Sequence, residues 1–280
     1  MKINITIPTS WNELSQKQFS NIVHQLETYQ RIIKDSPQVV AETSAKLYLQ
    51  LSKELLRNNS YKNIRRVLNE IHPKEFIKWT KFLYAKISRT KFKQTITIDK
   101  HIFYGPGIRF RNATIAEFSY VDAVWYKWRM SQQEIWLDVL CAALYREHYQ
   151  TKWQRFINKL FPTPVPVDIR AKFLKQTVDA RADIFGKLAT KEKLAIAYTY
   201  EGCRNHIAKT FPHVFPEPVK VDGKVVPTLS NNKYVSFGEI ILDKIKGDPS
   251  KLADTNNVLV YDFLAIVEKD IKDFNKRPKQ

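Results

Sequence analysis

The residues that could do chemistry are few, and Cys203 with His206 comes closest to a catalytic pair. Three residues apart in a predicted helix, a thiol and a neighbouring base can share one helical face. No third group that would orient the base can be identified, so we favour a buried cysteine beside a surface histidine. Asp179 and Asp183 are four residues apart and could do acid–base work. A solvated helix face with local ion pairs is the interpretation we favour there.

The histidines do not suggest a metal site, because no two of them have HxH, HxxxH or HExxH spacing. Glycine is scarce, with 7 residues in 280, so the glycine-rich loops that hold phosphates in nucleotide-binding folds are not expected. The sequence therefore predicts no metal, no cofactor and no enzymatic activity.

Three short runs interleave cations with aromatic residues, at positions 78–82, 125–129 and 152–159. This pattern is typical of nucleic-acid binding, because cations hold phosphates and aromatic rings stack on bases. Helical spacing can also turn the aromatic rings into a core and the cations to solvent, and we favour that ordinary amphipathic arrangement. The candidate nucleic-acid-binding residues are Lys78, Lys81, Lys127, Arg129, Lys152, Trp153, Arg155 and Lys159.

A helix-opening signature occurs four times in the sequence and predicts where helices that could position these side chains begin. An apolar residue precedes Ser or Thr, and Gln or Glu stands three positions later, followed by another apolar residue. Such a capping box satisfies free backbone N–H groups, and the apolar pair closes over the helix start. We expect buried Phe19 and Phe118 in the first two copies. The capping and stapling residues are Ser15, Gln18 and Phe19; Thr114, Glu117 and Phe118; Ser131 and Glu134; and Ser236 and Glu239.

The first two copies share more than a cap, since residues 11–20 and 110–119 align an aromatic residue, the cap, Phe and Ser at an offset of 99. A duplicated unit would explain this. Convergence is the interpretation we favour, because any amphipathic helix gains from the same cap and staple.

The periodicity along the chain predicts a mainly α protein of several helices, with an N-terminal strand and two small β-hairpins. Alternating Ile3, Ile5 and Ile7 suggest the strand, residues 95–104 one hairpin, and residues 219–226 around Asp222-Gly223 the other. Helices are expected to begin at the four caps, one of them spanning 131–147, and another is expected over 168–185. Three prolines mark a soft boundary at 162–166 between an N-terminal helical lobe, 1–161, and a C-terminal helical lobe, 167–280.

The composition describes a basic folded chain. Hydrophobic residues make up 44%, well above disordered chains, and the formal net charge is +18. That charge is compatible with nucleic acid or an acidic protein surface as partner, or with a solvated basic surface, which we favour. No apolar run approaches the roughly 20 residues that span a bilayer. Two cysteines without CxxC spacing suggest a reducing compartment.

The opening residues 7–15 with Gln18-Phe19 resemble the start of tail-morphogenesis proteins of tailed bacteriophages and prophages, including tail assembly chaperone-like proteins. The stretches 110–146, 194–215 and 234–274 are compatible with this resemblance. It implies a non-enzymatic role in virion assembly or structure, with other phage structural or assembly proteins as partners. It further implies a location in the host cytoplasm during assembly, or in the virion. The high charge departs from a plain tail chaperone and leaves a role beside nucleic acid open.

Overall fold

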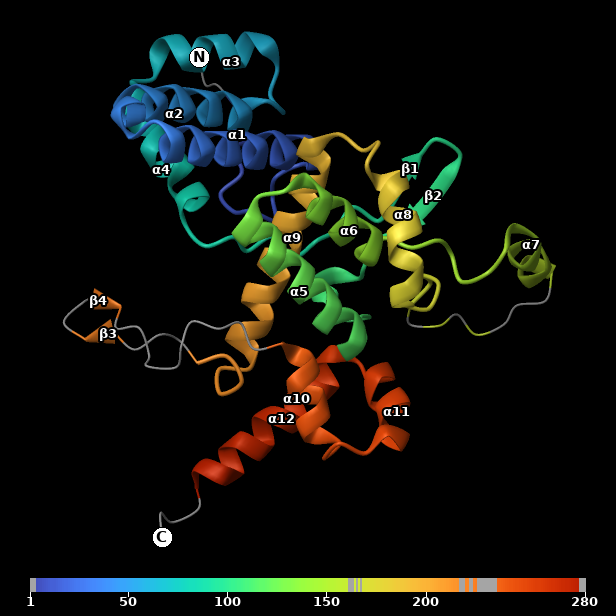
Figure 1. Ribbon diagram of the computed structural model, residues 1–280. Coiled ribbons are helices and arrows are strands. Elements are labelled where there is room, and N and C mark those ends of the chain that lie inside the picture. Colours follow the sequence, from blue (N-terminus) through green and yellow to red (C-terminus); the bar gives the residue numbers. More distant parts are fainter. Residues whose placement is uncertain are drawn as a thin grey trace. The chain divides into compact units, whose positions relative to one another are not determined.

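The chain divides into two compact units, and each unit is built from two separate stretches of sequence. The first comprises Met1–Lys93 and Leu188–Cys203, and the second Gln94–Lys187 and Arg204–Gln280. The computed structural model describes residues 4–160, 164, 166, 168–216, 220–221, 224–225 and 236–276 (Figure 1). The boundary expected at 162–166 lies within the first stretch of the second unit, and most of it lies outside the described residues.

The first unit is helical, and its central helices α1 and α2 pack against each other (Figure 1). The short α4 packs on α2. Helix α9 belongs to this unit as far as Cys203. The bounds are α1 Gln16–Asp35, α2 Val40–Leu56, α3 Tyr61–Glu70, α4 Phe76–Thr80 and α9 Thr190–Thr210.

The expected N-terminal strand is not seen in residues 4–9, although burial alternates over residues 4–7 as predicted. Ile5 and Ile7 are partly buried against an apolar cluster of the first unit. The backbone between them pairs with a side chain instead of a strand. Asn59 accepts a hydrogen bond from the N–H of Thr6 and donates one to its carbonyl, both at 2.8 Å. An amide side chain thus takes the place of a strand partner.

The second unit combines a small hairpin with helices packed around α5. The antiparallel strands β1 and β2 form the hairpin expected at 95–104, with Ile98 opposite His101. Helix α6 packs on α5 and α8, while α10, α11 and α12 pack on α5. Strands β3 and β4 also pair antiparallel, and the expected Asp222-Gly223 turn lies outside the described residues. The bounds are β1 Thr95–Ile98, β2 His101–Tyr104, α5 Ile115–Ser131, α6 Glu134–Leu144, α7 Lys152–Leu160, α8 Val178–Phe185, β3 Lys220–Val221, β4 Lys224–Val225, α10 Phe237–Lys244, α11 Leu252–Asn257 and α12 Val260–Asn275.

The first two helix openings bury their phenylalanines completely. Ser15 accepts a hydrogen bond from the Gln18 N–H at 3.3 Å, and the Gln18 side chain accepts one from the Ser15 N–H at 3.0 Å. Phe19 and Phe118 are both 0% exposed. Thr114 accepts a hydrogen bond from the Glu117 N–H, whereas the Glu117 carboxylate binds Arg146 and Arg170. The staples therefore close over both helix starts.

The prediction that Ser131 caps the third of these helices is wrong. Ser131 lies in the last turn of α5 and does not begin the next helix. Gln132 follows in a left-handed conformation, with φ of 57°, and its N–H reaches back to Trp128. Such a residue ends a helix. Helix α6 therefore begins at Glu134 and ends at Leu144, short of the expected 147.

At the fourth opening, Ser236 caps α10 by accepting a hydrogen bond from the Gly238 N–H at 3.1 Å. Glu239 is exposed. The helix expected over 168–185 is confined to α8, at its C-terminal end, because Asp168 and Arg170 are held by ion pairs. Among the described residues, no helix combines the length and apolar character needed to span a membrane.

Candidate functional site

In the central run of cations and aromatics, 125–129, both cations lie over aromatic rings of the second unit. The Lys127 ammonium lies 4.6 Å from the centre of the Trp136 ring, and the Arg129 guanidinium 5.3 Å from that of Trp128. Trp128 is 0% exposed. Cations over aromatic faces within about 6 Å are attracted to them. This run therefore stabilises the junction of α5 and α6, and its buried indole cannot stack on a base.

The first run, 78–82, lines a surface hollow of about 620 Å³ in the first unit. Trp79 packs edge-on against Phe76, and Phe82 packs edge-on against buried Trp11. Lys78 and Lys81 belong to the lining of this hollow. Here the run leaves both ring surface and cations accessible.

The third run forms α7, and its aromatic residues face solvent instead of a core. Trp153 is 71% exposed, and Phe156 and Leu160 are each 61% exposed. Positions i, i+3 and i+7 lie on one face of a helix, so these three side chains form a continuous apolar strip. We call it the α7 face. The amphipathic interpretation requires these side chains to be buried inside the chain. It is therefore wrong for α7.

Polar residues cap the start of α7, bind it to Tyr104 and give it positive charge. Thr151 and Gln154 form a reciprocal capping pair, with hydrogen bonds of 2.8 and 3.2 Å. The Arg155 guanidinium donates to the Tyr104 hydroxyl at 3.1 Å, and Lys159 is exposed. Lys152 begins the helix. The segment contains no acidic residue, so its polar positions carry only positive charge.

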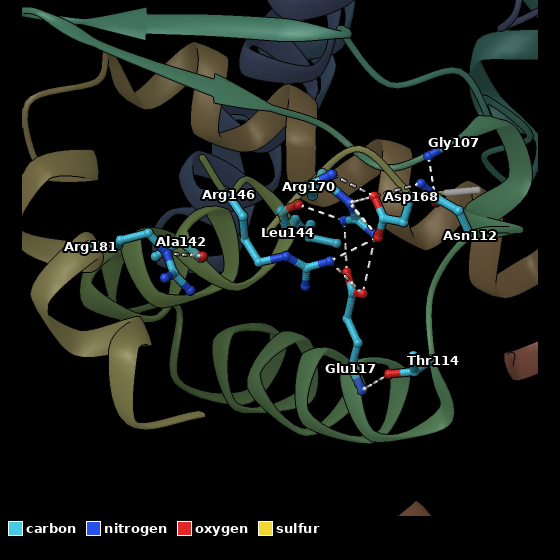
Figure 2. A network of polar contacts seen from close by, with 10 residues as sticks. All are labelled: Gly107, Asn112, Thr114, Glu117, Ala142, Leu144, Arg146, Asp168, Arg170 and Arg181. Atoms are coloured by element: carbon cyan, nitrogen blue, oxygen red, sulfur yellow. Dashed lines mark hydrogen bonds and ion pairs between the residues drawn. The ribbon is translucent and has the colours of Figure 1, made fainter. Parts of the chain in front are cut away.

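A buried ion-pair network, not foreseen from the sequence, accounts for the other notable charges of the second unit. The Glu117 carboxylate accepts hydrogen bonds from Arg170 at 2.8 Å and from Arg146 at 3.0 Å (Figure 2). The same two arginines bind Asp168. Asn112 links Asp168 to the Gly107 N–H. The two guanidinium groups and two carboxylates balance one another.

The network also satisfies the end of α6. Arg170 donates to the Leu144 carbonyl at 2.8 Å and Arg181 to that of Ala142 at 3.0 Å, two of the groups that a helix end leaves free (Figure 2). Burial would lower the pKa of Arg170, but Glu117 and Asp168 raise it above its ordinary value. All these partners are internal, so the network holds the fold together.

The catalytic candidates of the sequence lie on two helices, Cys203 and His206 on α9 and Asp179 and Asp183 on α8. The Cys203 thiol is buried and donates to the Thr90 carbonyl at 3.7 Å. Burial and the nearby Arg109, with other cations, lower the pKa of His206. Asp179 and Asp183 are exposed on α8. Within the described part of the chain, no group of three His, Cys, Asp or Glu residues could hold a metal ion.

Neither the capping pair of α7 nor the ion-pair network was predicted from the sequence, for two different reasons. The capping pair of α7 has the T-x-x-Q core in the sequence, but polar residues Gln150 and Arg155 flank it, so the full signature does not detect it. Apart from the Asp168–Arg170 pair, the ion pairs of the network join residues more than 20 positions apart, and no local spacing predicts them.

Comparisons with protein-family models, curated proteins and solved structures find no match for this chain.

Proposed function

We propose that this chain is a non-enzymatic structural or assembly protein of a tailed bacteriophage that acts through contacts with other proteins. The observation that carries the proposal is the α7 face, with Trp153, Phe156 and Leu160 exposed on one side of a short helix. The resemblance of residues 7–19 to tail-morphogenesis proteins supports the phage context. Such a protein would act in the host cytoplasm during assembly, with the virion as a second location.

The α7 face has the properties of a helix that docks into a groove. Full burial of a large apolar side chain stabilises a complex by about 1.5–3 kcal/mol. Peptide helices that bind grooves present such anchors at i, i+3, i+4 and i+7. Trp153 and Phe156, with Leu160 one turn further, match this spacing. Tryptophan is also among the residues that dominate interface energies.

The charge of α7 indicates the chemistry of the partner. Lys152, Arg155 and Lys159 accompany the apolar strip without any acidic residue, and the whole chain carries a net charge of +18. An apolar groove edged by aspartate and glutamate would complement this helix and speed the encounter. The partner that this chemistry favours is another assembly or structural protein with an acidic-edged groove.

The proposal is tested in the phage or prophage that encodes the chain. We expect the double substitution Trp153→Ser/Phe156→Ser to fold, because both side chains are exposed, and to block formation of complete particles. The control is Met130→Ser/Ile135→Ser, which changes two exposed apolar residues of the same unit, 69% and 57% exposed. Normal particles from the α7 variant, or from a strain that lacks the gene, would contradict the proposal.

A second candidate function is nucleic-acid binding by the same helix, favoured by the exposed Trp153 indole and by the cations Arg155 and Lys159 that α7 also carries. Aromatic rings and cations together bind single strands. This function requires affinity that falls steeply as salt rises, because bound phosphates release counterions. Fluorescence anisotropy of a labelled single strand measures it, and no binding at low salt would exclude it.

A further inference from the structure

The surface hollow of the first unit has the chemistry of a small-ligand site, and it is independent of α7. Trp79, Phe82 and Tyr84 supply aromatic surface, and Lys78 and Lys81 supply positive charge. Its volume of about 620 Å³ lies within the range of about 300–1,000 Å³ that is usual for ligand pockets. We propose that this hollow binds a nucleotide, that is, a ligand that joins a planar base to a phosphate.

The aromatic lining is suited to a planar ring because its side chains are held from behind. The Trp79 ring lies 4.9 Å from that of Phe76 at an interplanar angle of 85°. The Phe82 ring lies 5.7 Å from that of Trp11 at 83°. Phe76 and Trp11 are buried, so they fix the two lining rings in place, while both rings remain partly exposed. Tyr84 is 61% exposed and adds an accessible ring at the same hollow.

Two lysines of the hollow, Lys78 and Lys81, would bind the phosphate of the nucleotide. Lys78 is paired with Glu75 at 2.9 Å, but both side chains are exposed, and such surface pairs are worth little. Its ammonium can therefore turn to a phosphate at small cost. Lys81 is exposed and lines the same hollow. Residues 74–86 contain four lysines and one glutamate, so the local field favours an anion.

A proline-rich peptide is the main competing occupant, because aromatic grooves bind such peptides. The local positive charge favours the nucleotide, since a proline-rich backbone offers no anion for Lys78 and Lys81. The nucleotide itself could be free or part of a single strand, because both present the same base and phosphate.

Titration calorimetry of the full-length chain tests the inference with AMP, adenosine, inorganic phosphate, a short single-stranded oligonucleotide and a proline-rich peptide. We expect AMP or the oligonucleotide to bind more tightly than adenosine or phosphate alone, and the stronger of the two identifies the source. Tyr84→Ser should weaken this binding about tenfold, as expected for a lost stacking partner. Lys81→Gln should weaken the binding of AMP but leave the binding of adenosine unchanged.

Matched controls come from exposed residues of the same unit. Tyr61→Ser and Lys62→Gln change a 79% exposed tyrosine and an exposed lysine outside the hollow, and both variants should bind AMP as the unmodified chain does. The inference is overturned if neither AMP nor the oligonucleotide binds, if the peptide binds in their place, or if Tyr84→Ser and Tyr61→Ser behave alike. A circular dichroism spectrum of each variant shows that it has folded.

Discussion

At the scale of single residues, Glu117 shows how a buried carboxylate can be retained. Its side chain is 1% exposed, and Arg146 and Arg170, which bind it, are 2% and 0% exposed. Removing such charges from water is costly, and only close, hydrogen-bonded partners compensate for the loss of solvation. The energy of this network therefore depends on all its members being present.

Replacing Glu117 by glutamine should destabilise the second unit by about 3–5 kcal/mol, because two buried guanidinium groups lose their shared anion. Urea unfolding followed by circular dichroism measures the change. Glu239→Gln is the matched control, since Glu239 also stands three positions after a helix cap but is exposed. Its effect should stay within about 0.5 kcal/mol. Equal effects of the two substitutions would contradict the structural role of the network.

Truncation of either staple, Phe19→Ala or Phe118→Ala, should cost about 3–5 kcal/mol in the free energy of unfolding. Both rings are 0% exposed, and each would leave a cavity that its neighbours cannot fill. The same urea experiment applies, with Phe274→Ala as control because that ring is 70% exposed. A loss below 1 kcal/mol for Phe19 or Phe118 would show that the staple contributes little.

At the scale of elements, Glu268 on α12 ties that helix to residues 213–214. Burial raises the pKa of Glu268, but hydrogen bonds from His213 and Lys272 and from the Val214 N–H outweigh it and lower the pKa below 4.5. The His213 Nδ1 atom lies 2.5 Å from the carboxylate. A lowered carboxyl pKa means that folding favours the ionised form of this side chain.

The stabilisation from Glu268 should therefore be fully present above pH 4.5 and disappear as the pH falls through the lowered pKa. Urea unfolding of the unmodified chain and of Glu268→Gln, measured from pH 7 to pH 3, tests this. The difference between the two should be constant at neutral pH and shrink below pH 4.5. A difference that is independent of pH would contradict the expectation.

Helix starts could be predicted where one local interaction decides them, as at Ser15 and Thr114. Ser131 has the same pattern, but α5 continues through it until Gln132, so a neighbouring helix overrides the cap. The expected N-terminal strand failed for a similar reason, since the Asn59 side chain occupies the place of a partner strand. Local spacing cannot detect either competitor.

At the scale of the whole molecule, the mainly helical architecture could be predicted, and the candidate sites only in part. The sequence predicted the helices that begin after Ser15, Thr114 and Ser236, and the 95–104 hairpin. Of the three cationic and aromatic runs, periodicity alone could not tell buried Trp128 from exposed Trp153, because the spacing is compatible with both. The grouping of residues 188–203 with 1–93 likewise depends on contacts between distant segments.

The proposed contact between the α7 face and another protein can be measured by site-specific cross-linking. A photo-crosslinking amino acid in place of Phe156 is compared with the same group in place of Ile135, in cells in which the particles assemble. Mass spectrometry identifies the attached molecule. We predict that position 156 cross-links to one particle protein, at a groove edged by aspartate and glutamate, and that position 135 does not. No product at position 156, or products with nucleic acid or a second copy of this chain alone, would show that the α7 face does not make this contact.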